Sequence, residues 1–157
     1  MRQRGFEFVT GWEQRGVSLP RRATASSAGY DLAAGEAVTI APGASVLVPT
    51  GVKAYMQPDE VLYVHIRSSM AVKRGLVLTN SVGVIDADYY NNPDSEGQIF
   101  VALMNRGTSP VTIAKGERIA QAVFQKYLTV DGDTAGEGAL RRGGWGSTGR
   151  TSAGELF

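Results

Sequence analysis

Short apolar runs separated by turn residues constrain the fold of this 157-residue chain more than any other feature. Glycine and proline signals recur about every eight to twelve residues, and the run over 61–66 is the most strand-like because β-branched and aromatic residues fill it. Further strands are expected at 6–9, 36–40, 45–48, 52–56, 76–79, 98–104, 111–113 and 118–124. This spacing is typical of an all-β sandwich or barrel, and the lack of crossover helices argues against parallel βαβ units.

One short helix is expected directly after the 61–66 run. Ser68 or Ser69 suits its N-cap, and Gly75 suits the position after its last turn. No other segment of the sequence favours a helix as clearly.

The apolar pattern ends after Val130. Residues 131–138 are rich in glycine and acidic residues and have no apolar face, which predicts a flexible linker. We therefore expect a β domain over 1–130 and a flexible C-terminal arm over 131–157.

Charge and composition argue against several functions. The 16 basic and 15 acidic residues leave a net charge of +1, whereas nucleic-acid binders usually carry a basic face. Without cysteine there are no disulfides or cysteine-ligated metals, and the single histidine, His65, argues against a histidine zinc site or a Ser-His-Asp triad. The N-terminus lacks the apolar run of a secretory signal, and no stretch is long enough to span a bilayer. We expect a soluble, cytoplasmic protein that binds neither nucleic acid nor membrane.

Residues 79–90 contain the densest group of candidate chemistry. Gly83 permits close backbone approach, Asp86 and Asp88 bracket one small residue, and Tyr89 follows. Asp86 suits a general base that activates water, because an ionised carboxylate needs only correct placement; its alternative is a turn aspartate that accepts from backbone N–H groups. Tyr89 suits stacking on a flat group or, alternatively, a half-buried place in a strand.

Phosphate chemistry is suggested by Arg67, Ser68 and Ser69, where a strand meets the helix. A helix N-terminus with two hydroxyls and a guanidinium suits a polyphosphate, and the alternative is an ordinary serine cap with a surface arginine. Asp31 follows a Gly-Tyr pair and suits contact with the water shell of Mg²⁺, which keeps several waters. Its alternative is a plain turn aspartate.

Two further residues suit a flat, polar ligand. Asn80 offers a donor and an acceptor that match a base edge, or else closes a turn. Trp145 lies in a glycine-rich tail that lacks the lysine and the helix of a P-loop. That tail is either a frayed terminus or an arm that orders over a ligand, and the large aromatic residue favours the arm.

Five segments, taken in order, resemble the five motifs of the homotrimeric dUTP diphosphatases (dUTPases). They are 28–32, 67–71, 83–89, 116–121 and 143–149. The resemblance covers nearly the whole chain, and five ordered motifs are far more specific than any one of them. It implies a jelly-roll-like β fold and a homotrimer whose sites take motifs from three chains. It also implies hydrolysis of dUTP to dUMP and diphosphate with Mg²⁺, which limits uracil incorporation into DNA and supplies dUMP for thymidylate synthesis.

The resemblance also implies roles for individual residues. Asp86 is expected to orient the attacking water, with Gln121 near it. Tyr89 is expected to pack under the deoxyribose and exclude a 2′-hydroxyl, and Asp31 to contact Mg²⁺ through water. The other expected substrate-binding residues are Arg67, Ser68, Ser69, Asn80, Gly83, Gln98, Ile99, Phe100, Arg142, Trp145, Gly146, Ser147 and Thr148.

Two features depart from the family pattern. After Tyr89 most members turn tightly through glycine, whereas here residues 90–97 make a longer connection. Leu140 stands where the last motif usually has arginine, so Arg141 or Arg142 is expected to take the γ-phosphate, with Arg142 favoured. Trp145 stands at a position where phenylalanine is usual, which preserves stacking.

Two alternative functions remain open at this point. The dCTP deaminases are similar in fold and also carry an Arg-Ser-Ser motif, but they would need a catalytic glutamate in the central strands. A nucleotide-responsive regulatory binding protein is the non-enzymatic alternative, because phage-type members of the family are reported to bind partner proteins.

Overall fold

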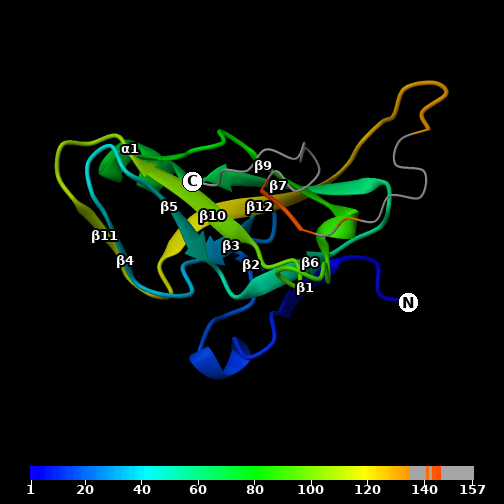
Figure 1. The fold of residues 1–157 in the computed structure, drawn as a ribbon, viewed down its shortest axis with the longest axis horizontal. Helices are drawn as coiled ribbons and strands as arrows, with labels where there is room; N and C mark the ends of the chain where they lie inside the picture. Colours follow the sequence, from blue (N-terminus) through cyan, green and yellow to red (C-terminus); the bar gives the residue numbers. More distant parts are fainter. Residues whose placement is uncertain (135–140, 142, 146–157) are drawn as a thin grey trace.

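Strands joined by short turns make up most of the described chain (Figure 1). The computed structural model describes residues 1–134, 141 and 143–145. The strands are β1 (Gly5–Phe8), β2 (Arg21–Arg22), β3 (Tyr30–Ala33), β4 (Val38–Ile40), β5 (Ser45–Pro49), β6 (Val52–Tyr55), β7 (Glu60–Ile66), β8 (Leu76–Leu78), β9 (Gly83–Asp86), β10 (Phe100–Asn105), β11 (Val111–Ile113) and β12 (Arg118–Lys126). Within these residues the only α-helix is α1 (Ser68–Arg74), and η1 (Glu13–Arg15) and η2 (Ala87–Tyr89) are single 3-10 turns.

The described strands form four sheets in which every pairing is antiparallel. The largest has the order β2-β3-β12-β7-β9, and the next has the order β5-β10-β8. The pairs β1-β6 and β11-β4 complete the set. These sheets do not close on themselves, so the predicted all-β fold with one short helix is confirmed in its open, sandwich-like form.

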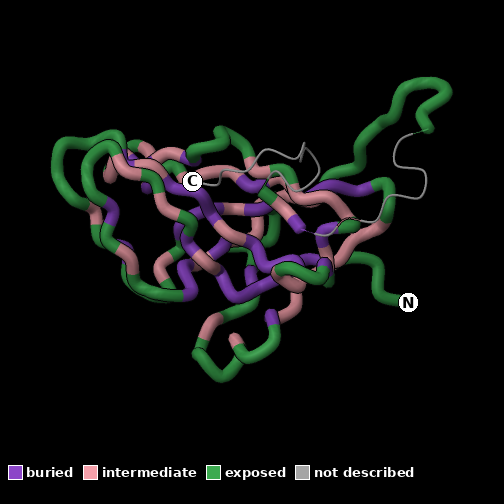
Figure 2. The backbone as a smooth tube through the Cα atoms, viewed as in Figure 1, coloured by how far each residue is buried: buried purple, intermediate pink, exposed green. Residues whose placement is uncertain are grey.

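One hydrophobic core joins the largest sheet to the others. Leu32 of β3, Leu62 of β7 and Ile119 of β12 are fully buried in the same cluster as Leu103 of β10 and Ile113 of β11. Figure 2 shows buried stretches running through the middle of the molecule and exposed turns at its ends. Burying one such side chain stabilises the fold by about 1.5–3 kcal/mol, so these contacts fix the strands that carry the site.

Helix α1 begins one residue earlier than a cap at Ser68 requires. Arg67 occupies the N-cap position in an extended conformation, with φ −75° and ψ 139°, and makes no side-chain cap bond. The expected cap at Ser68 or Ser69 is therefore wrong: β7 runs directly into the helix, and both serines lie inside its first turn. Gly75 ends the helix at φ +65°, as predicted, in a conformation that suits glycine.

Three strands were not predicted, namely β2, β3 and β9. Each is short and carries charged residues such as Arg21, Asp31 and Asp86, which local propensity favours in turns. Long-range pairing keeps them extended, because β3 lies against β12 and β9 lies against β7. No helix in the described part of the chain is long and apolar enough to cross a membrane.

A buried carboxylate ties the N-terminus to the largest sheet. Glu60 at the start of β7 is 3% exposed, and Arg4 donates to its Oε1 from Nε at 2.9 Å and from Nη2 at 2.5 Å. The backbone N–H of Gln57 donates to its Oε2 at 3.0 Å. The hydrogen bonds from Arg4 hold the pKa of the Glu60 carboxyl below its usual range.

Acid should therefore weaken the fold partly through Glu60. A carboxyl with a lowered folded-state pKa contributes stability above its unfolded pKa of about 4.3, and loses it as pH falls through the folded value. We expect Glu60→Gln to destabilise the protein at pH 7 by about 1–3 kcal/mol and to flatten the decline of the unfolding free energy below pH 4.5. Urea unfolding between pH 3 and pH 7 measures both effects.

Glu36→Gln is the matched control, because the Glu36–Arg15 pair is about half exposed and should contribute little. Equal pH slopes for the wild type and Glu60→Gln would contradict the assignment.

Candidate functional site

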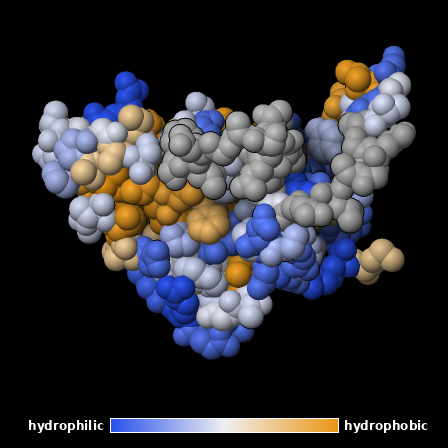
Figure 3. All heavy atoms as spheres, in the orientation of Figure 1, coloured by the Kyte–Doolittle hydropathy of each residue, from blue (hydrophilic) through white to orange (hydrophobic). Residues whose placement is uncertain are grey.

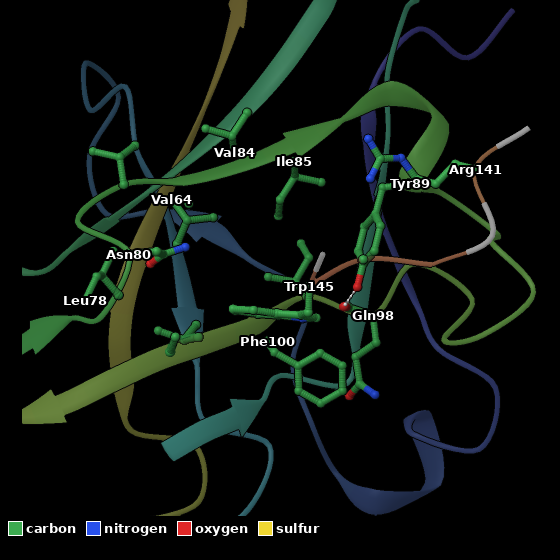
Figure 4. A pocket seen from close by; sticks show the side chains of 16 residues that line it. Val64, Leu78, Asn80, Val84, Ile85, Tyr89, Gln98, Phe100, Arg141 and Trp145 are labelled. Atoms are coloured by element: carbon green, nitrogen blue, oxygen red, sulfur yellow. Dashed lines mark hydrogen bonds between the residues drawn. The ribbon is translucent and has the colours of Figure 1, made fainter. Parts of the chain in front are cut away.

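A pocket of about 320 Å³ opens between β9 and β10, as Figure 4 shows. Valine, leucine and isoleucine residues form much of its wall, and Asn80 and Gln98 bring amide groups to it. Seven of the residues expected to bind substrate line it: Asn80, Gly83, Tyr89, Gln98, Ile99, Phe100 and Trp145. An apolar cavity with a few polar groups is typical of a small-molecule site.

One wall of the pocket is β9, and Gly83 lets this strand approach β7 closely. Gly83 pairs with Val64, and a Cβ at position 83 would lie 3.0 Å from the Val64 Cβ. Among the described strands β9 is the last of its sheet, so its other edge borders the pocket. Backbone groups on that edge suit the polar edge of a planar ring.

Backbone groups of Gln98 and Ile99 are already used inside the chain. The Tyr89 hydroxyl donates to the Gln98 carbonyl at 2.8 Å. The Ile99 carbonyl accepts from the Thr50 hydroxyl at 2.6 Å. The carbonyls of Gln98 and Ile99 are therefore already hydrogen-bonded at the pocket wall.

The candidate base Asp86 lies at the end of β9, where the chain turns into η2. Its Oδ2 lies 2.5 Å from Nη2 of Arg141, and the Nε of the same guanidinium lies 2.7 Å from Oδ1 of Asp88. The Arg141 side chain is 18% exposed, whereas those of Asp86 and Asp88 are 48% and 61% exposed, so the ion pairs lie at the open rim of the pocket. No local pattern predicts this pairing, because Arg141 is 55 and 53 residues away from its two partners in the chain.

Three described residues of the C-terminal arm, Arg141, Gly144 and Trp145, line the pocket of their own chain. A Cβ at Gly144 would lie 2.7 Å from Cε2 of Tyr89, so the backbone there rests against the tyrosine ring. Trp145 lines the pocket and remains 51% exposed. Four expected substrate-binding residues lie outside the described residues: Arg142, Gly146, Ser147 and Thr148.

A second group of candidate residues gathers around Asp31 on β3. Its carboxylate lies 3.2 Å from Nε of Arg67 and 2.9 Å from Nη1 of Arg118. Gln121 pairs with Asp31 across β12 and β3, and packs so closely on Gly29 that a Cβ there would lie 2.5 Å from its Oε1. The role of Arg118 was missed, because a register shift between Arg118 and Ala120 directs it toward Asp31 and the sequence does not reveal that bulge.

The structure thus divides the predicted site residues into two groups. In the described part of the chain the pocket group contains Asn80, Tyr89 and Trp145, with Asp86 at its rim. Arg67, Ser68, Ser69, Asp31 and Gln121 do not line that pocket. One chain therefore presents two partial sites.

The donor set near Asp31 fits a metal ion only through water. The described residues hold no group of three or more histidine, cysteine or acidic residues that could bind a metal. The two guanidinium groups already neutralise Asp31, whose side chain is 14% exposed. Mg²⁺ commonly binds through substrate phosphates, one or two carboxylates and several waters, so a contact through water remains compatible with these residues.

The open β fold contains an apolar pocket with a few amide groups. Arg67 and Arg118 gather around Asp31 apart from this pocket. These features define the class of a small-molecule-binding β protein, suited to a planar ligand with a negatively charged tail. A family model described as dUTPase matches residues 15–149. The chain belongs to the dUTPase family, so the resemblance drawn from the five motifs is confirmed.

Individual relatives agree with this assignment. The chain is 55% identical over 149 residues to the deoxyuridine 5′-triphosphate nucleotidohydrolase of Lactococcus lactis subsp. lactis (strain IL1403), covering 95% of this chain and 99% of the relative. It is 43% identical over 145 residues to the protein of that name from Anaeromyxobacter sp. (strain Fw109-5), covering 87% and 92%.

Solved structures match the fold. The crystal structure of the Streptococcus mutans dUTPase matches with a TM-score of 0.75 at 53% identity, over 82% of this chain and 99% of that chain. The dUTPase of Staphylococcus bacteriophage 80alpha matches with a TM-score of 0.70 at 20% identity, over 86% and 97%, and shares the fold. The jelly-roll-like expectation is therefore confirmed.

Proposed function

We propose that this protein hydrolyses dUTP to dUMP and diphosphate. Family membership and the relatives named deoxyuridine 5′-triphosphate nucleotidohydrolase support this activity. The observation that carries the proposal is the pocket itself, which gathers the Asn80 amide and the Tyr89 ring and has the Asp86 carboxylate at its rim. The reaction would limit uracil in DNA and supply dUMP for thymidylate synthesis, which suits a cytoplasmic enzyme.

Each part of the pocket suits one part of a deoxyuridine. The Asn80 amide and the open edge of β9 would bind the polar edge of uracil. The Tyr89 ring is 8% exposed and held by its bond to Gln98, so it would lie under the sugar and leave no room for a 2′-hydroxyl. Trp145 would stack on the base from the arm formed by residues 131–157.

The chemistry proposed is attack by water on the α-phosphorus in line with the leaving diphosphate. Asp86 would orient that water, and Gln121 would lie near it. Arg67, Ser68 and Ser69 would hold the phosphates and stabilise the charge that develops on the leaving group. The Arg142 guanidinium and the hydroxyls of Ser147 and Thr148 would add contacts to the γ-phosphate. No covalent intermediate is needed, which agrees with a chain that has one histidine and no cysteine.

Mg²⁺ would be bound mainly by the triphosphate, with Asp31 contacting it through water. When bound, the ion would neutralise charge on the leaving diphosphate. The chain's own contribution is to hold Asp31 in place with Arg67 and Arg118, so that the carboxylate faces the phosphate-binding residues.

The two partial sites support a homotrimer with shared active sites. The pocket of one subunit would meet the Asp31–Arg67–Gln121 group of a neighbour, because one chain does not join them. Figure 3 shows an apolar area over β5 and β10 on the viewed face, and Leu47 of β5 is 50% exposed. An exposed apolar area of this kind suits burial between subunits.

Parallel assays of diphosphate release from dUTP, dTTP, dCTP and UTP with Mg²⁺ test base, sugar and reaction together. We expect the kcat/KM for dUTP to be at least about 100-fold above those for dTTP, dCTP and UTP. A site that hydrogen-bonds the base and leaves no room beside the sugar discriminates strongly against nucleotides that lack those bonds or carry an extra group. Release of ammonia from dCTP would instead identify a deaminase. Tight dUTP binding without turnover would favour a regulatory binding protein.

Asp86→Asn should keep substrate binding and lose turnover. The amide cannot accept a proton from water, so kcat should fall by about 10²–10⁴-fold, while removal of a negative charge near the triphosphate should leave its affinity intact. Steady-state kinetics and calorimetric titration separate the two effects. Asp88→Asn is the matched control, since Asp88 shares Arg141 but has no assigned role in orienting water. Near wild-type kcat in Asp86→Asn would remove Asp86 from that role.

Mixing two inactive variants tests whether the sites are shared between subunits. Asp86→Asn damages the pocket group and Arg67→Ala the phosphate group, so each homogeneous variant should be nearly inactive. Co-refolded mixtures should recover about a quarter of wild-type activity, because random assembly makes that share of intersubunit sites intact. No recovery, with mixed oligomers demonstrated by mass spectrometry, would place each whole site within one chain.

A further inference from the structure

Residues 90–97 form a loop that folds back onto Tyr89, and Asn92 lies at its centre. The Asn92 side chain is buried, at 3% exposure. Its Nδ2 donates to the Tyr89 carbonyl at 2.8 Å and to Ser95 Oγ at 3.1 Å. Its Oδ1 accepts from the N–H groups of Asp94 and Ser95 at 3.1 Å and 3.0 Å. The amide therefore uses its full hydrogen-bonding capacity to hold the loop to Tyr89.

The loop also reaches the far end of the Tyr89 side chain. Ser95 Oγ lies 3.3 Å from the Tyr89 hydroxyl, which in turn donates to the Gln98 carbonyl at 2.8 Å. Gly97 closes the loop at φ +82°, and a Cβ there would lie 2.6 Å from the Tyr89 carbonyl, so only glycine permits this approach. Backbone and hydroxyl of Tyr89 are thus both fixed by the same segment.

A second set of contacts holds the outside of the loop. Asn91 and Glu96 have φ of 56° and 55°, a conformation that costs energy for residues other than glycine. The buried Lys53 ammonium donates to Asn91 Oδ1 at 2.6 Å and to Glu96 Oε2 at 3.3 Å, and Thr10 Oγ1 donates to Glu96 Oε2 at 3.0 Å. These contacts stabilise the strained loop without touching the Tyr89 side chain.

We infer that Asn92 and Ser95 are positioning residues that fix the Tyr89 ring and thereby set how strongly the site discriminates against ribonucleotides. The inference rests on the proposed function, in which Tyr89 packs under the deoxyribose. Tyr89 is held by hydrogen bonds at its backbone carbonyl and at its hydroxyl, so its ring cannot move away from an added 2′-hydroxyl. If these ties are lost, the ring can tilt, and a ribose gains room.

Asn92→Asp tests this directly, because the carboxylate keeps an acceptor for the Asp94 and Ser95 N–H groups and loses the donor to the Tyr89 carbonyl. We expect the ratio of kcat/KM for dUTP to that for UTP to fall about tenfold, with a lower KM for UTP as the main change. Ser95→Ala should lower the ratio about threefold, and Ser95→Thr, which restores a hydroxyl, should recover it.

Glu96→Gln is the control within the same loop. It weakens the outer contacts with Lys53 and Thr10, so it should lower the melting temperature and leave the dUTP/UTP ratio at the wild-type value. A ratio that falls equally in Glu96→Gln would show that general loosening of the loop, rather than the ties to Tyr89, controls selectivity, and would overturn the inference.

A wild-type ratio in folded Asn92→Asp would also overturn it. If that variant does not fold, the Ser95→Ala and Ser95→Thr pair decides, and an unchanged ratio in Ser95→Ala then refutes the positioning role. Tyr89→Ala separates this inference from the proposed function. If Tyr89→Ala keeps the wild-type ratio, the proposed role of Tyr89 fails; if it collapses the ratio while the Asn92 and Ser95 variants do not, only the positioning role fails.

Discussion

The pairing of β12 with β7 on one side and β3 on the other is the constraint on which both partial sites depend. Gln121 lies opposite His65 in one pairing and opposite Asp31 in the other. The next residue of the strand, Ala122, is fully buried. Side chains alternate between the two faces of a strand. If β12 slipped by one residue against its neighbours, Gln121 would point into the core and Ala122 would take its place beside Asp31. The alternation that builds the core therefore also fixes the site.

The two partial sites carry opposite net charges. Around Asp31 two guanidinium groups, those of Arg67 and Arg118, face one carboxylate and leave an excess of positive charge. At the pocket rim two carboxylates, those of Asp86 and Asp88, face the single guanidinium of Arg141. A cationic group suits the polyphosphate and an anionic one suits the orientation of water, so in the proposed homotrimer the two groups would bring opposite charges to the two ends of the reacting phosphate.

The sequence predicted most strands because apolar alternation is a local signal, and it predicted the pocket residues because the motifs resemble a family. It could not predict β9 as a strand, because Asp86 and Gly83 favour turns locally and only pairing with β7 extends them. It could not place Arg118, which a β-bulge redirects, or pair Arg141 with Asp86 across 55 residues. Such errors share one cause: the deciding contact is distant in sequence.

The ion pairs of Arg141 with Asp86 and Asp88 bring a residue of the C-terminal arm to the rim of the pocket. The guanidinium lies 2.5 Å from Asp86 Oδ2 and 2.7 Å from Asp88 Oδ1, and Trp145 lines the pocket four residues further along the chain. The Asp86 side chain is 48% exposed, so its carboxylate remains open to water beside this ion pair. In the proposed reaction a triphosphate would compete with the two carboxylates for Arg141, because it carries more negative charge. Because a ligand shifts an equilibrium only through its differential affinity for two states, a ligand without the phosphates would leave these ion pairs unchanged.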